Sequence, residues 1–152
     1  MSQVKTAPLP IELVQPTAEL GAAVHKLISE CPPLDTNSMY CNLLQSSHFA
    51  ETAVAAVLEN ELVGFISGYR IPQRPETLFI WQVAVGEKAR GQGLAGRMLK
   101  EILLREQNRD IKRIETTITP DNKASWALFE SLARKLDTEI SSSVMFDRKQ
   151  HF

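Results

Sequence analysis

The segment of residues 78–107 constrains the fold more than any other part of the sequence. It opens with the most apolar run of the chain, Leu78 to Val85, which predicts a buried strand. A loop that contains glycines follows from Gly86 to Gly93. Apolar residues then recur on one face up to Gln107, which predicts an amphipathic helix whose buried stripe holds Leu94, Met98, Leu99 and Ile102.

The rest of the chain predicts strands and helices around this unit, in the order β, α, α, β, β, β, α, β, α, β. Residues 52–58 and 62–70 form the two arms of a predicted hairpin, and Asp35 to Ser38 is rich in capping residues that start a second helix. We therefore expect an α/β domain with a mixed sheet. The other predicted elements are a strand at 11–14, a helix from Thr17 to Cys31, a proline-broken loop at 71–76, a strand at 111–118, a helix from Asn122 to Leu136 and a last strand at 141–146.

Length and composition limit the class of protein. The chain has 152 residues, which predicts a single domain over 1–152 with a loose tail at 1–10. Its 17 lysines and arginines balance 18 acidic residues, so no basic surface for nucleic acid is expected. No apolar run approaches the roughly 20 residues that cross a bilayer, and MSQVKTAPLP lacks the apolar core of a signal peptide. We expect a cytoplasmic protein that binds neither nucleic acid nor membrane.

The cysteines and histidines predict neither a disulfide scaffold nor a metal site. Cys31 and Cys41 belong to no CxxC pair, so we expect two reduced thiols. His25, His48 and His151 are scattered along the chain without the spacing of metal ligands. No metal cofactor is therefore expected.

The glycine loop before the predicted helix has the features of an anion site. Glycines let a ligand approach the backbone closely, and the first turn of a helix presents unpaired N–H groups and the positive end of the helix dipole. The loop is not a P-loop, because no Gly-Lys-Ser/Thr follows, and it lacks the acidic residue of a dinucleotide-binding fold. A plain β–α turn is the alternative interpretation.

Arg90-x-x-Gly93-x-Ala95 resembles the pyrophosphate-binding signature of the GNAT acetyltransferase superfamily, and the order of elements matches that fold. Residues 33–40, 64–70, 78–85 and 115–122 resemble more narrowly the L-2,4-diaminobutyrate acetyltransferases, the family that performs the acetylation step of ectoine biosynthesis. The resemblance implies a GNAT-like, mostly antiparallel sheet with a splayed central strand pair. It also implies acetyl-CoA as the acetyl donor, the 4-amino group of L-2,4-diaminobutyrate as the acceptor, and a homodimer.

The resemblance also implies the contacts with CoA. Main-chain N–H groups of the loop would hold the pyrophosphate, Val83 and Val85 would pair with the pantetheine through their backbones, and an N–H near Val83 or Ala84 would face the oxyanion. The expected cofactor-binding residues are Val83, Ala84, Val85, Arg90, Gly91, Gln92, Gly93, Leu94, Ala95, Gly96 and Asn122, which begins the helix after the next strand.

Acetyl transfer to an amine needs a group that takes up a proton, because an ammonium is not nucleophilic. Glu115 is the candidate, since a carboxylate inside the predicted strand 111–118 is unexpected and a buried glutamate needs a partner such as an ammonium. An edge-strand glutamate paired with a lysine is the alternative. Asp35, expected as the N-cap of the second helix, is the other candidate carboxylate for the substrate, unless it only caps that helix.

Four further residues complete the expected substrate site. Asn37 and Tyr40 follow Asp35 and would reach the same cleft. Trp81 is expected on the same strand face as Val83 and Val85, where it would wall the pocket. Arg70, at the hairpin end, is the candidate for binding the substrate carboxylate. Simple packing of Tyr40 and Trp81, and a surface role for Arg70, are the alternatives.

The usual general acid of the superfamily has no counterpart here. Many GNAT enzymes protonate the leaving thiolate with a tyrosine seven residues beyond the asparagine of the last helix, and Phe129 holds that position. Tyr40 is the candidate replacement, unless the role is empty or not needed, because a thiol is a fair leaving group. The alternative functions are acetylation of another small diamine or amino acid, acetylation of a protein, CoA binding without catalysis, and a plain interaction domain.

Overall fold

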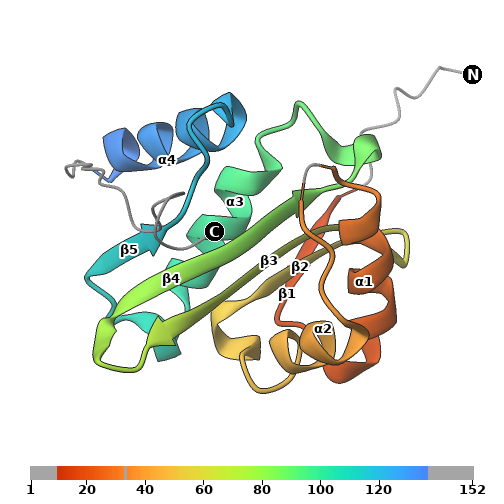
Figure 1. Ribbon diagram of the computed structural model, residues 1–152, viewed down its shortest axis with the longest axis horizontal. Coiled ribbons are helices and arrows are strands. Elements are labelled where there is room, and N and C mark those ends of the chain that lie inside the picture. The colour runs from red at the N-terminus through yellow and green to blue at the C-terminus, as the bar shows by residue number, and fades with distance from the viewer. Residues whose placement is uncertain (1–9, 33, 137–152) are drawn as a thin grey trace, which may run out of the picture. The chain divides into compact units, whose positions relative to one another are not determined.

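The sheet has five strands in the order β1-β2-β3-β4-β5 in the computed structural model, which describes residues 10–32 and 34–136. Successive pairs from β1 to β4 are antiparallel, whereas β5 runs in the same direction as β4 (Figure 1). The predicted mixed sheet is therefore confirmed. The strands are β1 (Glu12–Val14), β2 (Val54–Leu58), β3 (Glu61–Ile71), β4 (Arg74–Val85) and β5 (Arg113–Thr116).

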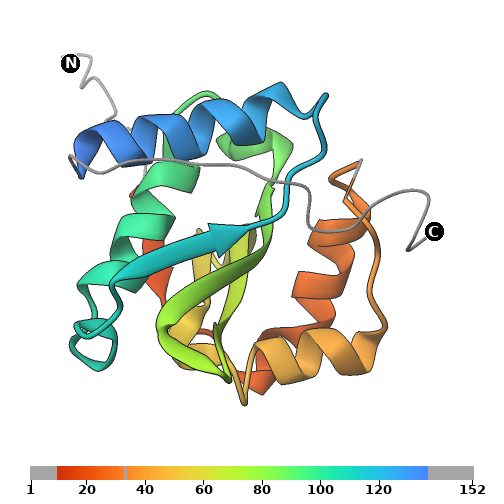
Figure 2. The same cartoon turned by 60° about the vertical axis from the view of Figure 1, so that its left-hand side comes forward.

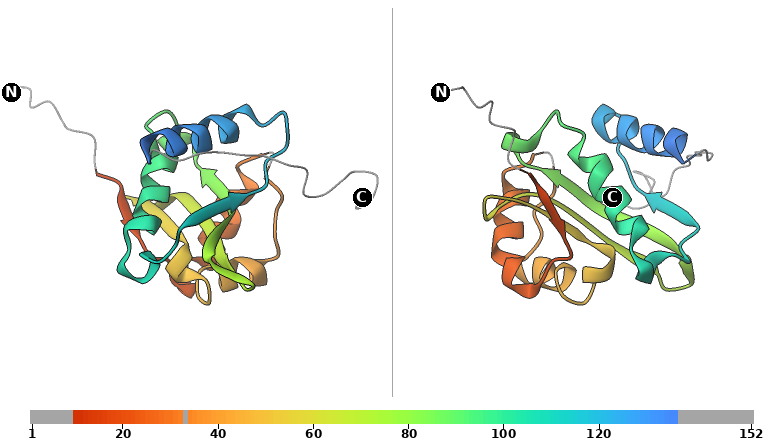
Figure 3. Two further views of the ribbon diagram at one scale, coloured as in Figure 1. Left: turned by 90° about the vertical axis from the view of Figure 1, so that its left-hand side faces the viewer. Right: turned by 180° about the vertical axis from the view of Figure 1, so that it is seen from behind.

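Helices cover both faces of this sheet. Figure 2 shows α1 and α2 on one face and α3 on the other, and the right-hand view of Figure 3 shows α3 from its own side. No helix of the described residues is long and apolar enough to cross a membrane. The helices are α1 (Gly21–Ser29), α2 (Met39–Gln45), α3 (Leu94–Leu104) and α4 (Lys123–Lys135), with short 3-10 turns η1 (Ala18–Leu20), η2 (Ala50–Thr52), η3 (Glu87–Ala89) and η4 (Glu106–Asn108).

The chain forms two compact units, Met1–Glu115 and Thr116–Phe152. The first contains α1 to α3 and nearly the whole sheet, and the second contains α4. The predicted single domain stays a prediction, and the strand predicted at 141–146 lies outside the described residues.

Apolar side chains fill the space between the sheet and the helices. On one face, Val24, Leu27 and Ile28 of α1 pack with Phe65 and Ala84 of the sheet. On the other face lies the stripe predicted for α3, and this prediction is confirmed. Its members Leu94, Met98, Leu99 and Ile102 are at most 2% exposed.

The two hairpins differ from one another in how well the sequence predicts them. Glu59 and Asn60 have φ of 48° and 65° and link Leu58 to Glu61 in a two-residue turn, as the predicted hairpin requires. The loop predicted at 71–76 is wrong, because Ile71 pairs with Arg74 and leaves only two residues in the turn. Pro75 is tolerated in β4 because it stands near the beginning of the strand, where its missing N–H costs no central ladder bond.

A β-bulge interrupts the pairing of β3 with β4. Ser67 lies opposite Gln82 and Gly68 lies opposite Ile80, so that Trp81 is an extra residue without a partner across the ladder. Gly68 allows this close approach. A Cβ at position 68 would lie 2.8 Å from the carbonyl oxygen of Phe79.

We expect the Gly68→Ala substitution to destabilise the fold. Backbone atoms surround the missing Cβ, including the carbonyl oxygen of Thr52 at 3.1 Å, and they cannot rotate away as a side chain would. Overpacking of this kind costs about 1–3 kcal/mol. Urea unfolding measures the loss. Gly96→Ala is the matched control, because nothing lies within 4 Å of its added methyl group and alanine favours a helix. Equal losses in the two variants would contradict this explanation.

The C-terminal end of α3 is fastened to the beginning of β2. The Nη1 group of Arg105 donates hydrogen bonds to the carbonyl oxygens of Ala50, Glu51 and Ala53 at 3.2, 3.0 and 2.6 Å. Burial lowers the pKa of this guanidinium below its usual range. The sequence predicted that this helix reaches Gln107, but it ends at Leu104. Arg105 leaves the helix because it adopts an extended backbone, from which its side chain makes these contacts.

Candidate active site

The loop from Arg90 to Gly96 is shaped to receive an anion. Gly91 and Gly93 have φ of 77° and 70°, in the left-handed region that side chains disfavour. Gly93 is the N-cap of α3, and no side chain caps this helix. Its first N–H groups are thus left for another acceptor. An added Cβ at Gly91, Gly93 or Gly96 would meet nothing within 4 Å, so the space above the loop is open.

The other expected members of this loop differ in what their side chains do. The Nε of Arg90 donates to the carbonyl oxygen of Val85 at 3.0 Å, so this arginine is held against the end of β4. Leu94 is 2% exposed and belongs to the core, which leaves only its main chain for a ligand. Gln92 is exposed, and Ala95 is half-buried. The geometry is that of a main-chain anion site beside one anchored guanidinium.

The outer edge of β4 extends beyond β5. The N–H of Lys112 donates to the carbonyl oxygen of Glu76 at 2.8 Å, so β5 starts beside the early part of β4. β5 has only four residues, whereas β4 has 12. With equal rise per residue, β5 ends beside Ile80, and the backbone from Trp81 to Val85 lies past its end. This segment contains the expected pantetheine contacts.

The bulge changes which face each side chain of β4 occupies. Val85 lies opposite Gly64, whose added Cβ would meet Met98 and Leu94, so Val83 and Val85 face α3. Trp81 instead stacks edge-on against Tyr69, with ring centroids 5.8 Å apart. Tyr69 shares its face of β3 with Phe65, which packs against α1. The prediction that Trp81 shares a face with the two valines is wrong, because the extra residue shifts the alternation by one.

Asp35 does not cap α2. The N-cap is Ser38, whose Oγ accepts a hydrogen bond from the N–H of Cys41 at 3.0 Å. Asp35 lies three residues earlier, exposed, in the connection between α1 and α2. Among the described residues its carboxylate has no hydrogen-bond or ion-pair partner, so it is available for a cationic ligand.

Asn37 and Tyr40 lie on the same side of the sheet as Trp81. Asn37 is half-buried and donates a hydrogen bond from its Nδ2 to the Oε1 of Gln82 at 2.9 Å. Tyr40 is 69% exposed and Trp81 is 38% exposed. The structure thus brings Asp35, Asn37, Tyr40 and Trp81 to one face of the sheet, beside the connection that leads into α2.

Glu115 lies in β5, the edge strand of the sheet, and is half-exposed instead of buried. Its Oε2 forms an ion pair with the Nη2 of Arg74 at 3.0 Å, with side chains 39% and 48% exposed. The partner is an arginine and not the lysine that the alternative interpretation named. Exposed ion pairs of this kind are worth about 0–1 kcal/mol, so the pair with Arg74 does not commit Glu115 strongly to this partner.

Arg70 is engaged by other parts of the protein. Its Nη2 pairs with the Oδ1 of Asp110 at 2.8 Å and also donates to the carbonyl oxygen of Gln107. Its Nη1 donates to the carbonyl oxygen of Pro75. A substrate carboxylate would have to replace Asp110 as the partner of this guanidinium.

We expect the Arg70→Gln substitution to raise the pKa of Asp110. The hydrogen bond from Arg70 is the main cause that holds the pKa of this carboxyl below its usual range. A lowered pKa stabilises the fold above the pKa of the unfolded chain, and this contribution is lost as the pH falls through the folded-state pKa. An NMR titration of the Asp110 carboxyl carbon measures the shift. An unchanged titration would show that Arg70 does not set it.

Two predicted residues lie in the second unit. Asn122 is the N-cap of α4, where its Oδ1 accepts a hydrogen bond from the N–H of Ser125 at 3.2 Å. Phe129 is buried, at 8% exposure. The contact of Asn122 with CoA stays a prediction.

Comparison with known proteins decides the family. A sequence model of the Acetyltransferase (GNAT) family matches residues 22–133. The chain belongs to the GNAT acetyltransferase family. The matched residues include the glycine loop that opens α3, and the contact of this loop with CoA stays a prediction.

Relatives within the GNAT family narrow the similarity further. The chain is 77% identical to the L-2,4-diaminobutyric acid acetyltransferase of Methylotuvimicrobium alcaliphilum over 148 residues, which cover 97% of this chain and 86% of that protein. It is 51% identical to the enzyme of the same name from Vibrio cholerae, over 95% of this chain and 83% of that one. A solved diaminobutyrate acetyltransferase from Paenibacillus lautus, in complex with L-2,4-diaminobutyric acid and coenzyme A, superposes with a TM-score of 0.83 at 40% identity and covers 85% of this chain and 78% of that chain.

The sequence did not single out three polar residues that contact the predicted site residues or each other: Ser67, Arg74 and Gln82. Gln82 carried a signal, because a lone glutamine inside the most apolar strand needs a hydrogen-bond partner. Ser67 and Arg74 carried none, since their roles depend on the register of β3 with β4 and of β4 with β5. Among the described residues, no group of three or more potential ligands gathers as it would around a metal ion.

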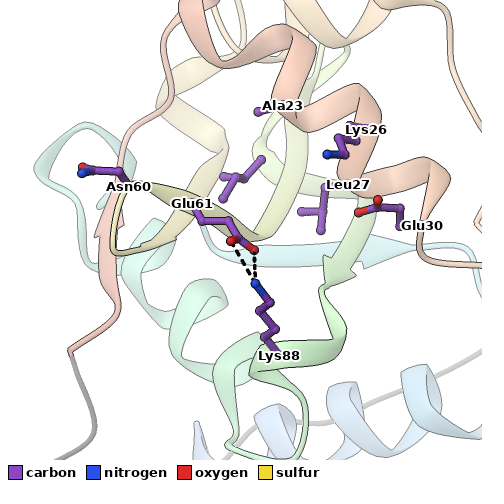
Figure 4. Close-up of a pocket in the computed structure, with 8 residues that line it drawn as sticks. Ala23, Lys26, Leu27, Glu30, Asn60, Glu61 and Lys88 are labelled. Carbon is purple, nitrogen blue, oxygen red and sulfur yellow. Dashed lines mark hydrogen bonds and ion pairs between the residues drawn. The ribbon is translucent and has the colours of Figure 1, made fainter.

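A cleft of about 540 Å³ lies elsewhere in this GNAT domain, between α1 and the turn from β2 to β3 (Figure 4). Leu27 and Leu62 contribute its apolar surface, and an ion pair of Lys88 with Glu61 at 3.0 Å stands at its side. None of the residues predicted for CoA or for the substrate lines it. The location of the active site at the α3 loop and at the face that carries Trp81 stays a prediction.

Proposed function

We propose that this chain transfers the acetyl group of acetyl-CoA to the 4-amino group of L-2,4-diaminobutyrate. The products are N4-acetyl-L-2,4-diaminobutyrate and CoA, and the reaction is the acetylation step of ectoine biosynthesis. The observation that carries the proposal is the 77% identity over 97% of the chain to a diaminobutyric acid acetyltransferase. The Paenibacillus lautus enzyme, which binds diaminobutyrate and coenzyme A, supports the same substrates.

The donor binds along β4 and α3 in this proposal. The bare N-terminus of α3 receives the pyrophosphate through main-chain N–H groups. The pantetheine follows the outer edge of β4 at Val83 and Val85, which carries the thioester toward the bulge. A main-chain N–H near Val83 or Ala84 donates to the carbonyl oxygen as it becomes an oxyanion. Loss of one such donor costs other enzymes about 3–4 kcal/mol.

The acceptor binds on the face that carries Trp81. Asp35, which has no partner among the described side chains, attracts one of the two ammonium groups. Trp81 and Tyr40 present exposed rings that close around the aliphatic chain. Asn37 supplies a polar contact, and Arg70 is the candidate partner for the carboxylate if Asp110 gives way.

The reaction removes two protons from the substrate nitrogen, delivers one proton to the CoA thiolate and replaces the C–S bond of the thioester with a C–N bond. The amine has a pKa near 10, so only about one molecule in a thousand is neutral at pH 7. Glu115 accepts the ammonium proton, directly or through a water molecule. The neutral amine nitrogen then bonds to the thioester carbon, the C–S bond breaks, and the nitrogen releases its second proton to solvent as the amide forms. The thiolate takes a proton from Tyr40 or from solvent, because Phe129 stands where many GNAT enzymes have a tyrosine.

The setting of the enzyme follows from the same proposal. We infer a cytoplasmic enzyme that serves osmoprotection and acts as a homodimer. Met39 and Phe49 support the dimer, because they are large apolar side chains at least 37% exposed. Such side chains are favoured in the buried part of an interface between subunits.

A thiol-release assay tests the proposed function. We expect free CoA thiol with acetyl-CoA and diaminobutyrate, and far less with lysine, ornithine or a peptide with a free N-terminus. NMR of the product identifies the acetylated nitrogen. Thiol release with a peptide alone would favour protein acetylation. CoA binding without thiol release from any amine would favour a non-catalytic CoA-binding domain.

A further inference from the structure

Gln82 connects the bulge of β4 with the connection between α1 and α2. Its Nε2 donates a hydrogen bond to the carbonyl oxygen of Asp35 at 2.8 Å, and its Oε1 accepts one from the Nδ2 of Asn37 at 2.9 Å. A carbonyl oxygen only accepts, so the contact with Asp35 fixes the orientation of the amide. Both ends of one side-chain amide are thus used on one short segment, residues 34–38.

The main chain of Gln82 is held at the same place. Its N–H donates to the Oγ of Ser67 at 3.2 Å, and Ser67 is fully buried. A bulge interrupts the ladder of main-chain hydrogen bonds between two strands. Here the hydroxyl group of Ser67 accepts the hydrogen bond from the N–H of Gln82 in place of a main-chain carbonyl oxygen. Gln82 is therefore fixed to the sheet on one side and fixes the 34–38 segment on the other.

The 34–38 segment is also held by Leu34, which packs against the buried cluster that contains Phe65 and Ala84 of the sheet. Upstream of it, the Sγ of Cys31 contacts the carbonyl oxygen of Val85 at 3.5 Å, and the N–H of Leu34 donates to the carbonyl oxygen of Cys31. Downstream, Ser38 caps α2. Between these points, Asp35 and Asn37 each form a hydrogen bond with Gln82 of the sheet.

The bulge places Gln82 beside Trp81, which is one of the residues proposed to bind the substrate. Trp81 and Gln82 are consecutive residues that point to the same face of the sheet, which regular alternation would forbid. Trp81 presents its ring there while Gln82 holds the backbone of Asp35. Gln82 thus supplies the polar contacts that hold Asp35 and Asn37 near this ring.

We propose that Gln82 is a positioning residue that sets the specificity for the diamine. It holds the 34–38 segment against the bulge, so that the carboxylate of Asp35 meets the ammonium group of a substrate whose chain packs on Trp81. Gln82 acts through Asp35 and does not itself touch the reacting atoms. The inference rests on the proposed function, since it needs Asp35 to bind the diamine.

The Gln82→Met variant tests this inference. Methionine keeps the length and volume of glutamine but forms neither hydrogen bond. We expect the KM for diaminobutyrate to rise at least tenfold, while the KM for acetyl-CoA changes less than twofold. Hydrogen exchange of the amides of 34–38 should accelerate, because the segment loses its tie. Gln82→Leu, which also forms neither hydrogen bond, should give the same split, and it carries the test if Gln82→Met does not fold.

The Gln107→Met variant is the matched control. Gln107 also makes a bond between side-chain amides, from its Nε2 to the Oε1 of Gln15 at 3.3 Å, at a different place in the fold. We expect it to leave both KM values unchanged. An unchanged KM for diaminobutyrate in Gln82→Met, with an active wild-type enzyme, would overturn the inference. A parallel rise in both KM values would also overturn it, as it would indicate a general structural role. An inactive wild-type enzyme would instead overturn the proposed function.

Discussion

The Glu115→Gln variant should lose at least about 100-fold in kcat at pH 7, since general base catalysis contributes 10²–10⁴-fold in enzymes that use it. Glutamine keeps the shape of the side chain and still accepts a hydrogen bond from Arg74, but it does not take up a proton. Steady-state kinetics by thiol release measure the loss. Calorimetry should show an unchanged affinity for CoA, because Glu115 lies at the end of β5 and not on the loop that opens α3.

The pH dependence distinguishes a base from a charge partner. If Glu115 removes the proton, the loss in the variant should shrink as the pH approaches the amine pKa near 10, because the substrate then arrives neutral. A charge partner would instead raise the KM for diaminobutyrate and spare kcat. Glu106→Gln is the control, since Glu106 also pairs with an arginine, at 2.7 Å, on an exposed surface. Wild-type values of both constants in Glu115→Gln would remove this residue from the active site.

The Gly93→Val variant should weaken CoA binding at least tenfold. Gly93 has a φ of 70°, and a left-handed backbone costs a residue with a side chain about 1–2 kcal/mol, with a branched one at the upper end. The loop relieves this strain by rotating its peptide planes, which turns N–H groups away from the pyrophosphate. A tenfold loss corresponds to about 1.4 kcal/mol. Titration calorimetry with CoA measures it, and Arg90→Ala should add to the loss.

A second valine separates strain from ligand contact. Asn60 has a φ of 65° in the turn between β2 and β3, so Asn60→Val imposes a similar strain at another place. We expect it to lower the melting temperature and to leave the affinity for CoA unchanged. If Gly93→Val bound CoA as tightly as the wild-type protein, the assignment of the pyrophosphate to this loop would be wrong.

Periodicity predicted the elements well where one face of each is buried. The stripe of α3 and the α1 residues Val24, Leu27 and Ile28 follow from the period of a helix, because the core selects one face. The β2–β3 hairpin followed from the turn residues around Asn60. The loop predicted at 71–76 failed because two prolines suggested an interruption, whereas a strand accepts Pro75 at its beginning.

The candidate site was less accessible from the sequence, for geometric reasons. The faces of Trp81 and Val83 depend on a bulge, and one extra residue reverses a pattern of period two without any mark in the sequence. Ser38 caps α2 instead of Asp35, although both residue types cap helices well, and only the path of the chain chooses between them. Glu115 was a candidate because a carboxylate inside a strand is unexpected, yet the structure shows it half-exposed and paired with Arg74.

The helix α3 is tied at one end and bare at the other. Arg105 binds three carbonyl oxygens at its C-terminal end, whereas no side chain caps its N-terminus at Gly93. A nucleotide that completes the bare end adds its binding free energy to the folded state, about 2.7 kcal/mol at a concentration 100 times its Kd. The melting temperature of the chain should then rise with the combined concentration of CoA and acetyl-CoA, because both carry the same pyrophosphate.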